Sequence, residues 1–117
     1  MYQRHETGKL GEDLACKYLE TKGYKIIERN FEARQGEIDI IAIDKKEIVF
    51  IEVKTRTNIS YGKPAEAVDN KKQKHLIKTV EYYLYSRKLE NEFVRLDVIE
   101  IYLYGNKYRV NHIKQII

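Results

Sequence analysis

The chain has 117 residues, of which 43% are hydrophobic and 34% charged, a balance that excludes an intrinsically disordered or collagen-like protein. The length is typical of one domain, so we expect a single domain over residues 1–117. Its 22 Lys and Arg against 18 Asp and Glu give a formal charge of +4, which permits a polyanionic partner without requiring one.

Neither a membrane span nor a disulfide is expected. The apolar runs are short and the amino-terminal residues are polar, which argues against a spanning helix and a signal peptide. The single cysteine, Cys16, has no partner for an internal disulfide, and its setting in an amphipathic helix favours packing over chemistry. We therefore expect a cytoplasmic protein with no membrane partner.

The first predicted element is a helix over residues 8–22. Its apolar residues recur at helical spacing, Thr7 is suited to cap its start, and Gly23 is suited to end it. A short segment rich in β-formers follows over residues 24–30. The beginning of the chain thus predicts a helix followed by a strand.

A β-hairpin is the clearest pattern in the sequence. Two hydrophobic runs, over residues 37–43 and 48–54, are joined by a small polar turn, as in antiparallel strands. Their nearly continuous apolar character predicts that both strands lie in the middle of a sheet covered on both faces.

The rest of the chain predicts a helix and two strands. After a polar loop, a second helix is expected to begin near residue 66 or 69 and to end at residue 87. Strands follow over residues 93–102 and 108–113, around a Gly-Asn turn. The order of elements predicts an α/β fold in which helices flank both faces of a central mixed sheet of about five strands.

The hairpin is expected to bring acidic residues together. If residues 45–46 form its tip, Asp39 lies opposite Glu52, and Glu37 lies opposite Lys54. The Cβ atoms of such neighbours are about 4.5 to 5.5 Å apart on one face of the sheet. Two carboxylates so placed in apolar strands repel each other unless a cation or a proton lies between them.

A divalent cation is one solution to this repulsion. Mg²⁺ prefers oxygen ligands, so Asp39, Glu52 and a backbone carbonyl could bind it and leave positions for a phosphate oxygen and a water. Lys54 lies on the same face as Glu52, where its ammonium could orient the water or neutralise a pentavalent phosphate. The alternative is an exposed patch of ion pairs at the rim of the sheet.

Two runs of residues resemble a known family: Gly-Glu-Ile-Asp-Ile-Ile-Ala from residue 36 and Phe-Ile-Glu-Val-Lys-Thr-Arg from residue 50. They are similar to those of the YraN-like family of uncharacterised bacterial proteins, which has the restriction-endonuclease-like, Holliday-junction-resolvase-like fold. The resemblance spans nearly the whole chain. It includes Gly8, Gly11, Glu12, Ala15, Gly23, Tyr24, Arg29, Asn30, Gly62, Ala65, Glu66, Lys72 and residues 95–98.

The resemblance implies nucleic-acid binding and a Mg²⁺-dependent (or Mn²⁺-dependent) endonuclease. Asp39, Glu52 and Lys54 match the nuclease signature of an acid followed by acid-x-lysine, and so are the expected catalytic residues. Asp39 and Glu52 are also the expected metal ligands. Glu12 is expected to be a third ligand, directly or through water, because a glutamate in the first helix of the related resolvases has that role; an ordinary solvated glutamate is the alternative.

Three further residues are candidates for contact with nucleic acid. Arg56 follows the active strand into the expected substrate loop, and Lys72 and Gln73 lie at the start of the second helix. Each could contact a substrate phosphate, and each could equally be a solvated polar residue. The sequence leaves open DNA or RNA, branched or linear substrates, and monomer or homodimer.

We assign Asp97 a structural role instead. It lies two residues after Arg95, on the same face of a predicted strand. We expect structural hydrogen bonding there, with Arg95 reached only through a neighbouring residue.

The functional expectation is a metal-dependent nuclease that hydrolyses DNA phosphodiester bonds, including those of branched recombination or repair intermediates. One alternative is a structure-selective nucleic-acid-binding module without catalytic activity. Another is a protein-interaction subunit, in which the acids form ion pairs and the tyrosines form an interface.

Overall fold

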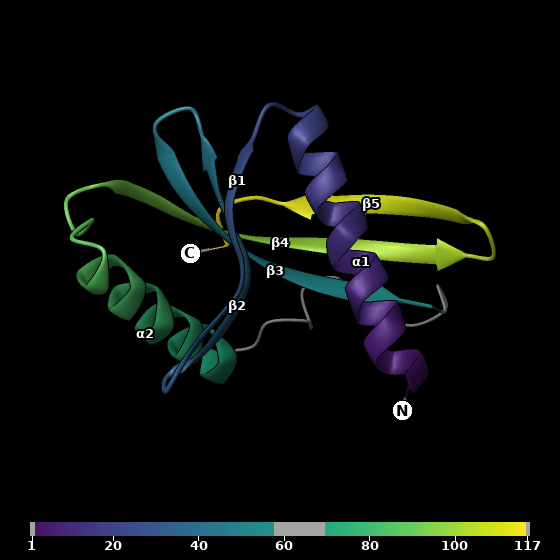
Figure 1. The fold of residues 1–117 in the computed structure, drawn as a ribbon, viewed down its shortest axis with the longest axis horizontal. Coiled ribbons are helices and arrows are strands. Elements are labelled where there is room, and N and C mark those ends of the chain that lie inside the picture. Colours follow the sequence, from purple (N-terminus) through teal and green to yellow (C-terminus); the bar gives the residue numbers. More distant parts are fainter. Residues whose placement is uncertain (1, 58–69, 117) are drawn as a thin grey trace.

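The structure, a computed structural model, describes residues 2–57 and 70–116. The expected polar loop after residue 57 and the expected helix starts at residues 66 and 69 lie outside these residues. Two helices and five strands follow one another along the chain (Figure 1). They are α1 (Tyr2–Thr21), β1 (Lys25–Ala33), β2 (Gly36–Asp44), β3 (Glu47–Arg56), α2 (Asn70–Ser86), β4 (Phe93–Tyr104) and β5 (Lys107–Ile113).

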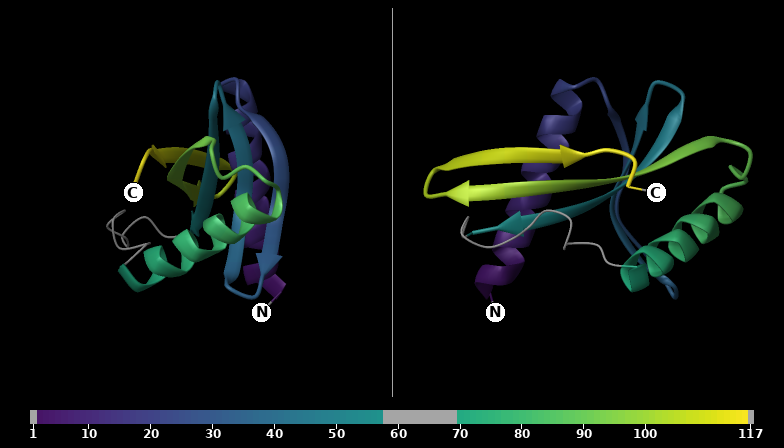
Figure 2. Two further views of the ribbon diagram at one scale, coloured as in Figure 1. Left: turned by 90° about the vertical axis from the view of Figure 1, so that its left-hand side faces the viewer. Right: turned by 180° about the vertical axis from the view of Figure 1, so that it is seen from behind.

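The strands form one mixed sheet in the order β1-β2-β3-β4-β5. β3 and β4 are parallel, and every other neighbouring pair is antiparallel. β2 and β3 therefore lie in the interior of the sheet, as the apolar hairpin predicts. Figure 2 shows that α1 crosses the longer part of the sheet while α2 lies toward its other end. The predicted α/β fold with a mixed five-stranded sheet and flanking helices is confirmed.

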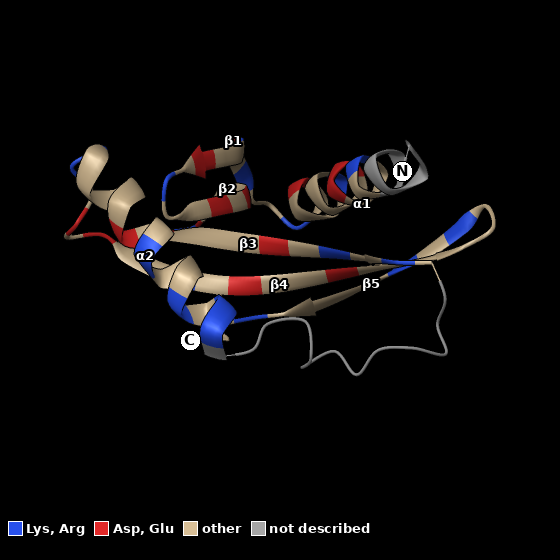
Figure 3. Cartoon of the chain, turned by 90° about the horizontal axis from the view of Figure 1, so that it is seen from below, with Lys and Arg blue, Asp and Glu red and all other residues tan. Residues whose placement is uncertain are grey.

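Each helix covers its own apolar cluster. α1 and the amino-terminal end of α2 lie on opposite sides of β3 and β4 (Figure 3). The cluster at α2 comprises Phe31, Ile38, Ile41, Ile48, Phe50, Leu76, Val80, Tyr83, Leu84, Leu96 and Val98. The cluster at α1 comprises Ala15, Cys16, Leu19, Tyr24, Ile40, Ala42, Val49, Ile51, Ile99 and Ile101. Because neighbouring strand residues point to opposite faces, these two sets interleave along β3 and β4.

The two ends of α1 differ in how well they were predicted. The helix begins at Tyr2, so Thr7 lies within it and does not cap it. Residues 2–7 contain no glycine or proline to stop the helix, and a capping residue marks only one place where a helix can begin. The carboxyl end agrees with the prediction: Gly23 has a φ of 91°, and the Tyr24 amide donates to the Leu19 carbonyl at 3.0 Å. Among the described residues, neither helix is long and apolar enough to cross a membrane.

The hairpin has the predicted register but a shorter ladder. β2 and β3 pair from Asp44 and Glu47 to Ile40 and Ile51, with residues 45–46 as the tip. The predicted pair of Glu37 with Lys54 is wrong. Glu37 instead lies opposite Glu32 of β1, because beyond Ile40 the second strand stays with β1 and leaves β3.

Arg95 and Asp97 form a buried ion pair within β4. The Arg95 Nε donates to Asp97 Oδ1 at 3.0 Å, and Nη2 donates to Oδ2 at 3.1 Å. The expectation that Arg95 reaches Asp97 only through a neighbour is therefore wrong, because the long guanidinium side chain folds back along one strand face. His112 Nε2 lies 2.7 Å from Asp97 Oδ2, and the Gln115 amide also donates to this carboxylate.

These contacts make stability depend on pH. Burial alone would raise the pKa of Asp97, but the bonds from His112 and Arg95 outweigh it and hold the pKa below its ordinary value of 3.8. The resulting stabilisation is complete above the pKa of the unfolded chain and is lost as the pH falls through the lower folded pKa.

We expect Asp97→Asn to destabilise the protein by about 3 kcal/mol at neutral pH, because the buried guanidinium of Arg95 loses one charged partner and keeps only Asp44 and Glu47. Urea unfolding measured from about pH 7 to about pH 3 should show the difference from the unmodified protein shrinking below about pH 4. A difference that stays constant over this range would contradict the prediction.

Candidate active site

The separation of β2 from β3 creates the site. Pairing stops at Ile40 and Ile51, so the next amides of β3 lose their backbone partners on β2. Asp39 replaces one of them, because its Oδ2 accepts a hydrogen bond from the Val53 amide at 2.8 Å. The edge of β3 beyond Ile51 is therefore open to side chains from both faces of the sheet.

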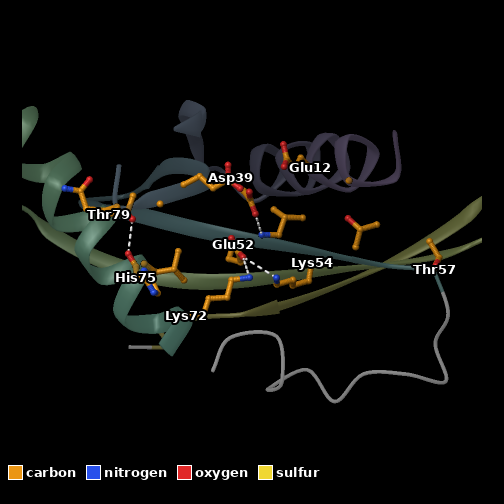
Figure 4. A pocket seen from close by; sticks show the side chains of 15 residues that line it. Glu12, Asp39, Glu52, Lys54, Thr57, Lys72, His75 and Thr79 are labelled. Carbon is orange, nitrogen blue, oxygen red and sulfur yellow. Dashed lines mark hydrogen bonds and ion pairs between the residues drawn. The ribbon is translucent and has the colours of Figure 1, made fainter. Parts of the chain in front are cut away.

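A cavity of about 800 Å³ lies at this open edge (Figure 4). Residues from α1, β2, β3 and α2 line it, so it brings together segments that are far apart in the sequence. Its charged lining residues are Glu12, Glu37, Asp39, Glu52, Lys54 and Lys72.

Asp39 and Glu52 form a coupled acidic pair. Their carboxyl groups share a hydrogen bond, although the two residues lie one position beyond the last backbone pair of β2 with β3, Ile40 with Ile51. Burial, followed by the negative charge of Glu52, raises the pKa of Asp39 to about 8. Burial would also raise the pKa of Glu52, but hydrogen bonds from Lys72 and Asp39 outweigh it and lower that pKa. The pair therefore favours holding one proton between its two members over carrying two negative charges.

Two lysines converge on the same oxygen of Glu52. The Lys72 Nζ lies 2.7 Å from Glu52 Oε2 and the Lys54 Nζ lies 3.3 Å from it, as Figure 4 shows. Burial and the neighbouring Lys72 lower the pKa of Lys54. Burial would lower the pKa of Lys72 too, but its hydrogen bond to Glu52 outweighs this and raises it. The site thus combines one carboxylate with two ammonium groups of different basicity.

Glu12 reaches the cavity from α1 but is bonded elsewhere. Its Oε1 lies 3.7 Å from Arg29 Nη2, and its side chain hydrogen-bonds Asn30. Burial is the main reason that the pKa of Glu12 is raised. Within residues 2–57 and 70–116, no three His, Cys, Asp or Glu side chains lie close enough together to hold an ion. A role of Glu12 as third metal ligand therefore stays a prediction.

Gly11 determines how closely α1 approaches the site. A Cβ atom at this position would lie 1.9 Å from Thr55 Oγ1, so only glycine allows the helix backbone to contact β3 here. Thr55 follows Lys54 and points to the α1 face, since neighbouring strand residues alternate. This contact places Glu12 at the rim of the cavity.

The other residues predicted for nucleic-acid contact are spread over the structure. Lys72 lies in the cavity, but Arg56 and Gln73 are not among its lining residues in the part of the chain described. Sequence reasoning did not find His75 and Thr79 of α2, which also line it. They lie one and two helical turns beyond Lys72 on the same side of α2, so the helical spacing from Lys72 could have predicted them.

Comparison with known proteins places the chain among uncharacterised relatives. Residues 11–101 match the family model described as "Uncharacterised protein family UPF0102". A UPF0102 protein of Caldanaerobacter subterraneus subsp. tengcongensis is 48% identical over 109 residues, which cover 91% of this chain and 89% of the relative. One from Clostridioides difficile is 48% identical over 108 residues, covering 92% and 93%. One from Persephonella marina is 49% identical over 94 residues, covering 80% and 81%.

We expect Gly11→Ala to destabilise the protein by about 1 to 3 kcal/mol, because α1 must move away from Thr55 to accommodate the methyl group. Gly8→Ala is the matched control. Position 8 is in the same helix, and a methyl group added there would meet no atom within 4 Å. It should stabilise the helix by about 0.5 to 1 kcal/mol. Thermal unfolding should show a lower Tm for Gly11→Ala and a higher Tm for Gly8→Ala. Equal changes in Tm would contradict the close contact of Gly11 with Thr55.

Two substitutions of Asp39 separate its hydrogen bond from its charge. Asp39→Asn keeps an oxygen for the Val53 amide and relieves the repulsion between two partly buried acids, so its stability in chelator should equal or exceed that of the unmodified protein. Asp39→Ala removes the acceptor and should cost about 1 kcal/mol relative to Asn. Urea unfolding of the two variants gives this difference, and identical midpoints would show that the Val53 bond is unimportant.

Proposed function

The chain belongs to the uncharacterised protein family UPF0102, and we propose that its cavity is the active site of a magnesium-dependent nuclease that hydrolyses DNA phosphodiester bonds. The observation that carries this proposal is the coupled pair of Asp39 and Glu52, held beside Lys54 in one cavity. Two adjacent, partly buried acids are costly to a fold, and a site that binds a cation gives a reason for them.

The donor set fits a hard divalent cation. Asp39 and Glu52 supply carboxylate oxygens, which Mg²⁺ and Mn²⁺ accept, and a cation bound by both would neutralise the repulsion that raises the pKa of Asp39. Two protein carboxylates with the remaining positions filled by water and substrate are typical of magnesium sites that act on phosphates. When bound, Mg²⁺ would stabilise negative charge on the phosphate and lower the pKa of a bound water.

The residues of the chain then have distinct tasks. Hydrolysis forms a bond from a water oxygen to phosphorus and breaks the bond from phosphorus to one ester oxygen. The attacking water loses one proton and the departing oxygen gains one, so the step is balanced by the water itself. Asp39 and Glu52 bind the cation, and Glu12 assists through water from the rim of the cavity. The Lys54 Nζ orients or activates the attacking water. Lys72, from α2, binds a phosphate oxygen of the substrate.

The order of the motif supports the same proposal. An acid on one strand of a hairpin, followed by acid-x-lysine on the next, resembles the signature of restriction-endonuclease-like and Holliday-junction-resolvase-like enzymes. That resemblance favours branched DNA among the substrates.

A second candidate is a structure-selective nucleic-acid-binding module without catalysis. The two lysines on Glu52 and the arginine beside Glu12 favour it, because these ion pairs already neutralise two of the three expected metal ligands. The two candidates differ in one measurement: cleavage of branched, duplex and single-stranded DNA with Mg²⁺, Mn²⁺ or chelator. Metal-dependent cleavage of any of these substrates supports the nuclease. Absence of cleavage of all of them, with Mg²⁺ shown to be bound, leaves only the binding module.

We expect Lys54→Ala to lower the cleavage rate by about 100-fold or more while nucleic-acid affinity changes by less than about threefold. The physical reason is that one lysine adds little to binding but acts where charge develops in the transition state. Single-turnover cleavage and fluorescence anisotropy measure the two quantities on the same substrate.

Lys78→Ala is the control for a lost positive charge. Lys78 is an exposed residue of α2 and is not among those that line the cavity, so both quantities should stay unchanged. Glu52→Gln should lose cleavage together with Mg²⁺ affinity, measured by calorimetry. Equal losses of rate and affinity in Lys54→Ala would argue that Lys54 serves binding alone.

A further inference from the structure

Half of one sheet face has polar side chains where the other half has an apolar cluster. The cluster beneath α2 ends at Phe50 on β3 and Val98 on β4. Seen from behind in Figure 2, the far ends of β3, β4 and β5 extend well beyond α2, with α1 on their other side. The side chains that follow on the α2 face are Lys54 and Arg56 of β3, Glu100 and Tyr102 of β4, and Asn111 and Arg109 of β5.

The register arranges these residues in two rows across the strands. In the first row, Lys54 of β3 lies opposite Glu100 of β4, and Glu100 lies opposite Asn111 of β5. In the second row, Arg56 lies opposite Tyr102, and Tyr102 lies opposite Arg109. Paired residues point to the same face, and successive rows are about 6.6 Å apart along the strands. The second row therefore follows directly from Lys54, away from the acidic pair.

Glu100 lies in the middle of the first row and is completely buried. Its Oε1 accepts hydrogen bonds from Asn111 Nδ2 at 2.8 Å and from the Tyr102 hydroxyl at 3.2 Å. Its Oε2 has no hydrogen-bond donor among the described residues, and the Arg56 Nη2 lies 3.5 Å away. Two neutral groups thus fix the carboxylate, and its charge attracts Arg56 without a close bond.

Arg56 has unused hydrogen-bonding capacity. Among the described residues its only ion pair is the long contact with Glu100, and its Nε has no hydrogen-bond acceptor. About a quarter of its side chain is exposed, at 26%. A guanidinium has five donors in a planar fork that matches the oxygens of a phosphate. A purely structural pair would use this fork on the carboxylate, as Arg95 does on Asp97.

The surroundings of Arg56 are basic. Arg109 stacks its guanidinium over the Tyr102 ring at 4.8 Å, and Lys54 lies one row closer to the cavity. Lys107 adds a further basic residue where β5 begins, and Figure 3 shows blue segments at the far end of β3 and around the turn between β4 and β5. Positive charge therefore continues from the cavity along this face of the sheet.

We propose that Glu100 is a positioning residue that holds Arg56 on this face, where Arg56 binds a backbone phosphate next to the one cleaved in the cavity. The inference rests on the proposed nuclease function and adds the direction in which the nucleic acid leaves the site. Glu100 supplies the buried charge that keeps the guanidinium close. The long contact leaves the donors of Arg56 for the phosphate.

A double-mutant cycle tests the coupling between the two residues. Arg56→Ala should weaken binding of a fluorescein-labelled DNA oligonucleotide by about fivefold at low salt and reduce the salt slope by roughly 0.7 to 0.9. Glu100→Gln keeps the shape of the side chain but loses the charge, and should reproduce most of this loss. The double variant should lose no more than Arg56→Ala alone, because Glu100 acts through Arg56. Arg56→Ala alone leaves the buried Glu100 carboxylate without its cation, which could destabilise the fold. The double variant replaces that carboxylate with a neutral amide, so it tests the coupling even if Arg56→Ala folds poorly.

Cleavage kinetics give an independent readout. Arg56→Ala and Glu100→Gln should raise KM by about fivefold and leave kcat unchanged, because the contact is made equally in the ground state and the transition state. Arg87→Ala is the matched control, because Arg87 also forms an ion pair with a glutamate, Glu28, at 2.9 Å. Arg87 directly follows the carboxyl end of α2, whereas Lys72 lies at the amino end of that helix. Arg87→Ala should change neither affinity nor KM.

Two results would overturn the inference. If the unmodified protein binds the oligonucleotide and the double variant binds it equally well, Arg56 and Glu100 have no part in binding, while the proposed nuclease site stands. If the unmodified protein binds no nucleic acid at low salt, the proposed function fails together with this inference.

Discussion

The separation of two adjacent strands is the constraint on which the rest of the site depends. A strand edge that loses its neighbour exposes backbone amides that must find another partner. Here the carboxylate of Asp39 takes that place at Val53, so the residue that compensates for the lost pairing is also the one that forms the acidic pair with Glu52. The cavity exists because the sheet opens at this point, and the opening is stable because an acid closes the hydrogen-bond gap.

Local patterns in the sequence predicted the main features of fold and site. The hairpin register follows from two apolar runs and the length of the turn between them, which together admit few alternatives. Because the register was right, the proximity of Asp39 and Glu52 and the placement of Lys54 on the same face followed from it. The strand order also agrees with the hydrophobic pattern, since the two most apolar runs became interior strands.

Features that depend on distant segments were not predictable in the same way. The ion pair of Lys72 with Glu52 depends on where α2 lies after a long connection, and no periodicity encodes that. Glu12 turned to Arg29 because of the packing of α1 beside β1, a tertiary relation. Arg95 folds back onto its own strand through a choice of side-chain conformation, which spacing alone leaves open.

The parallel pairing of β3 with β4 has a consequence for the order of folding. The β2–β3 hairpin joins residues close together in the chain, whereas β3 meets β4 only after α2 has been traversed. Contacts of low sequence separation form at the smaller loss of chain entropy, so the hairpin has the advantage in time. Asp39 and Glu52 therefore approach each other before α2 packs on the sheet and brings Lys72 beside them. Until the connection from β3 through α2 to β4 has formed, the repulsion between the two acids opposes formation of the hairpin.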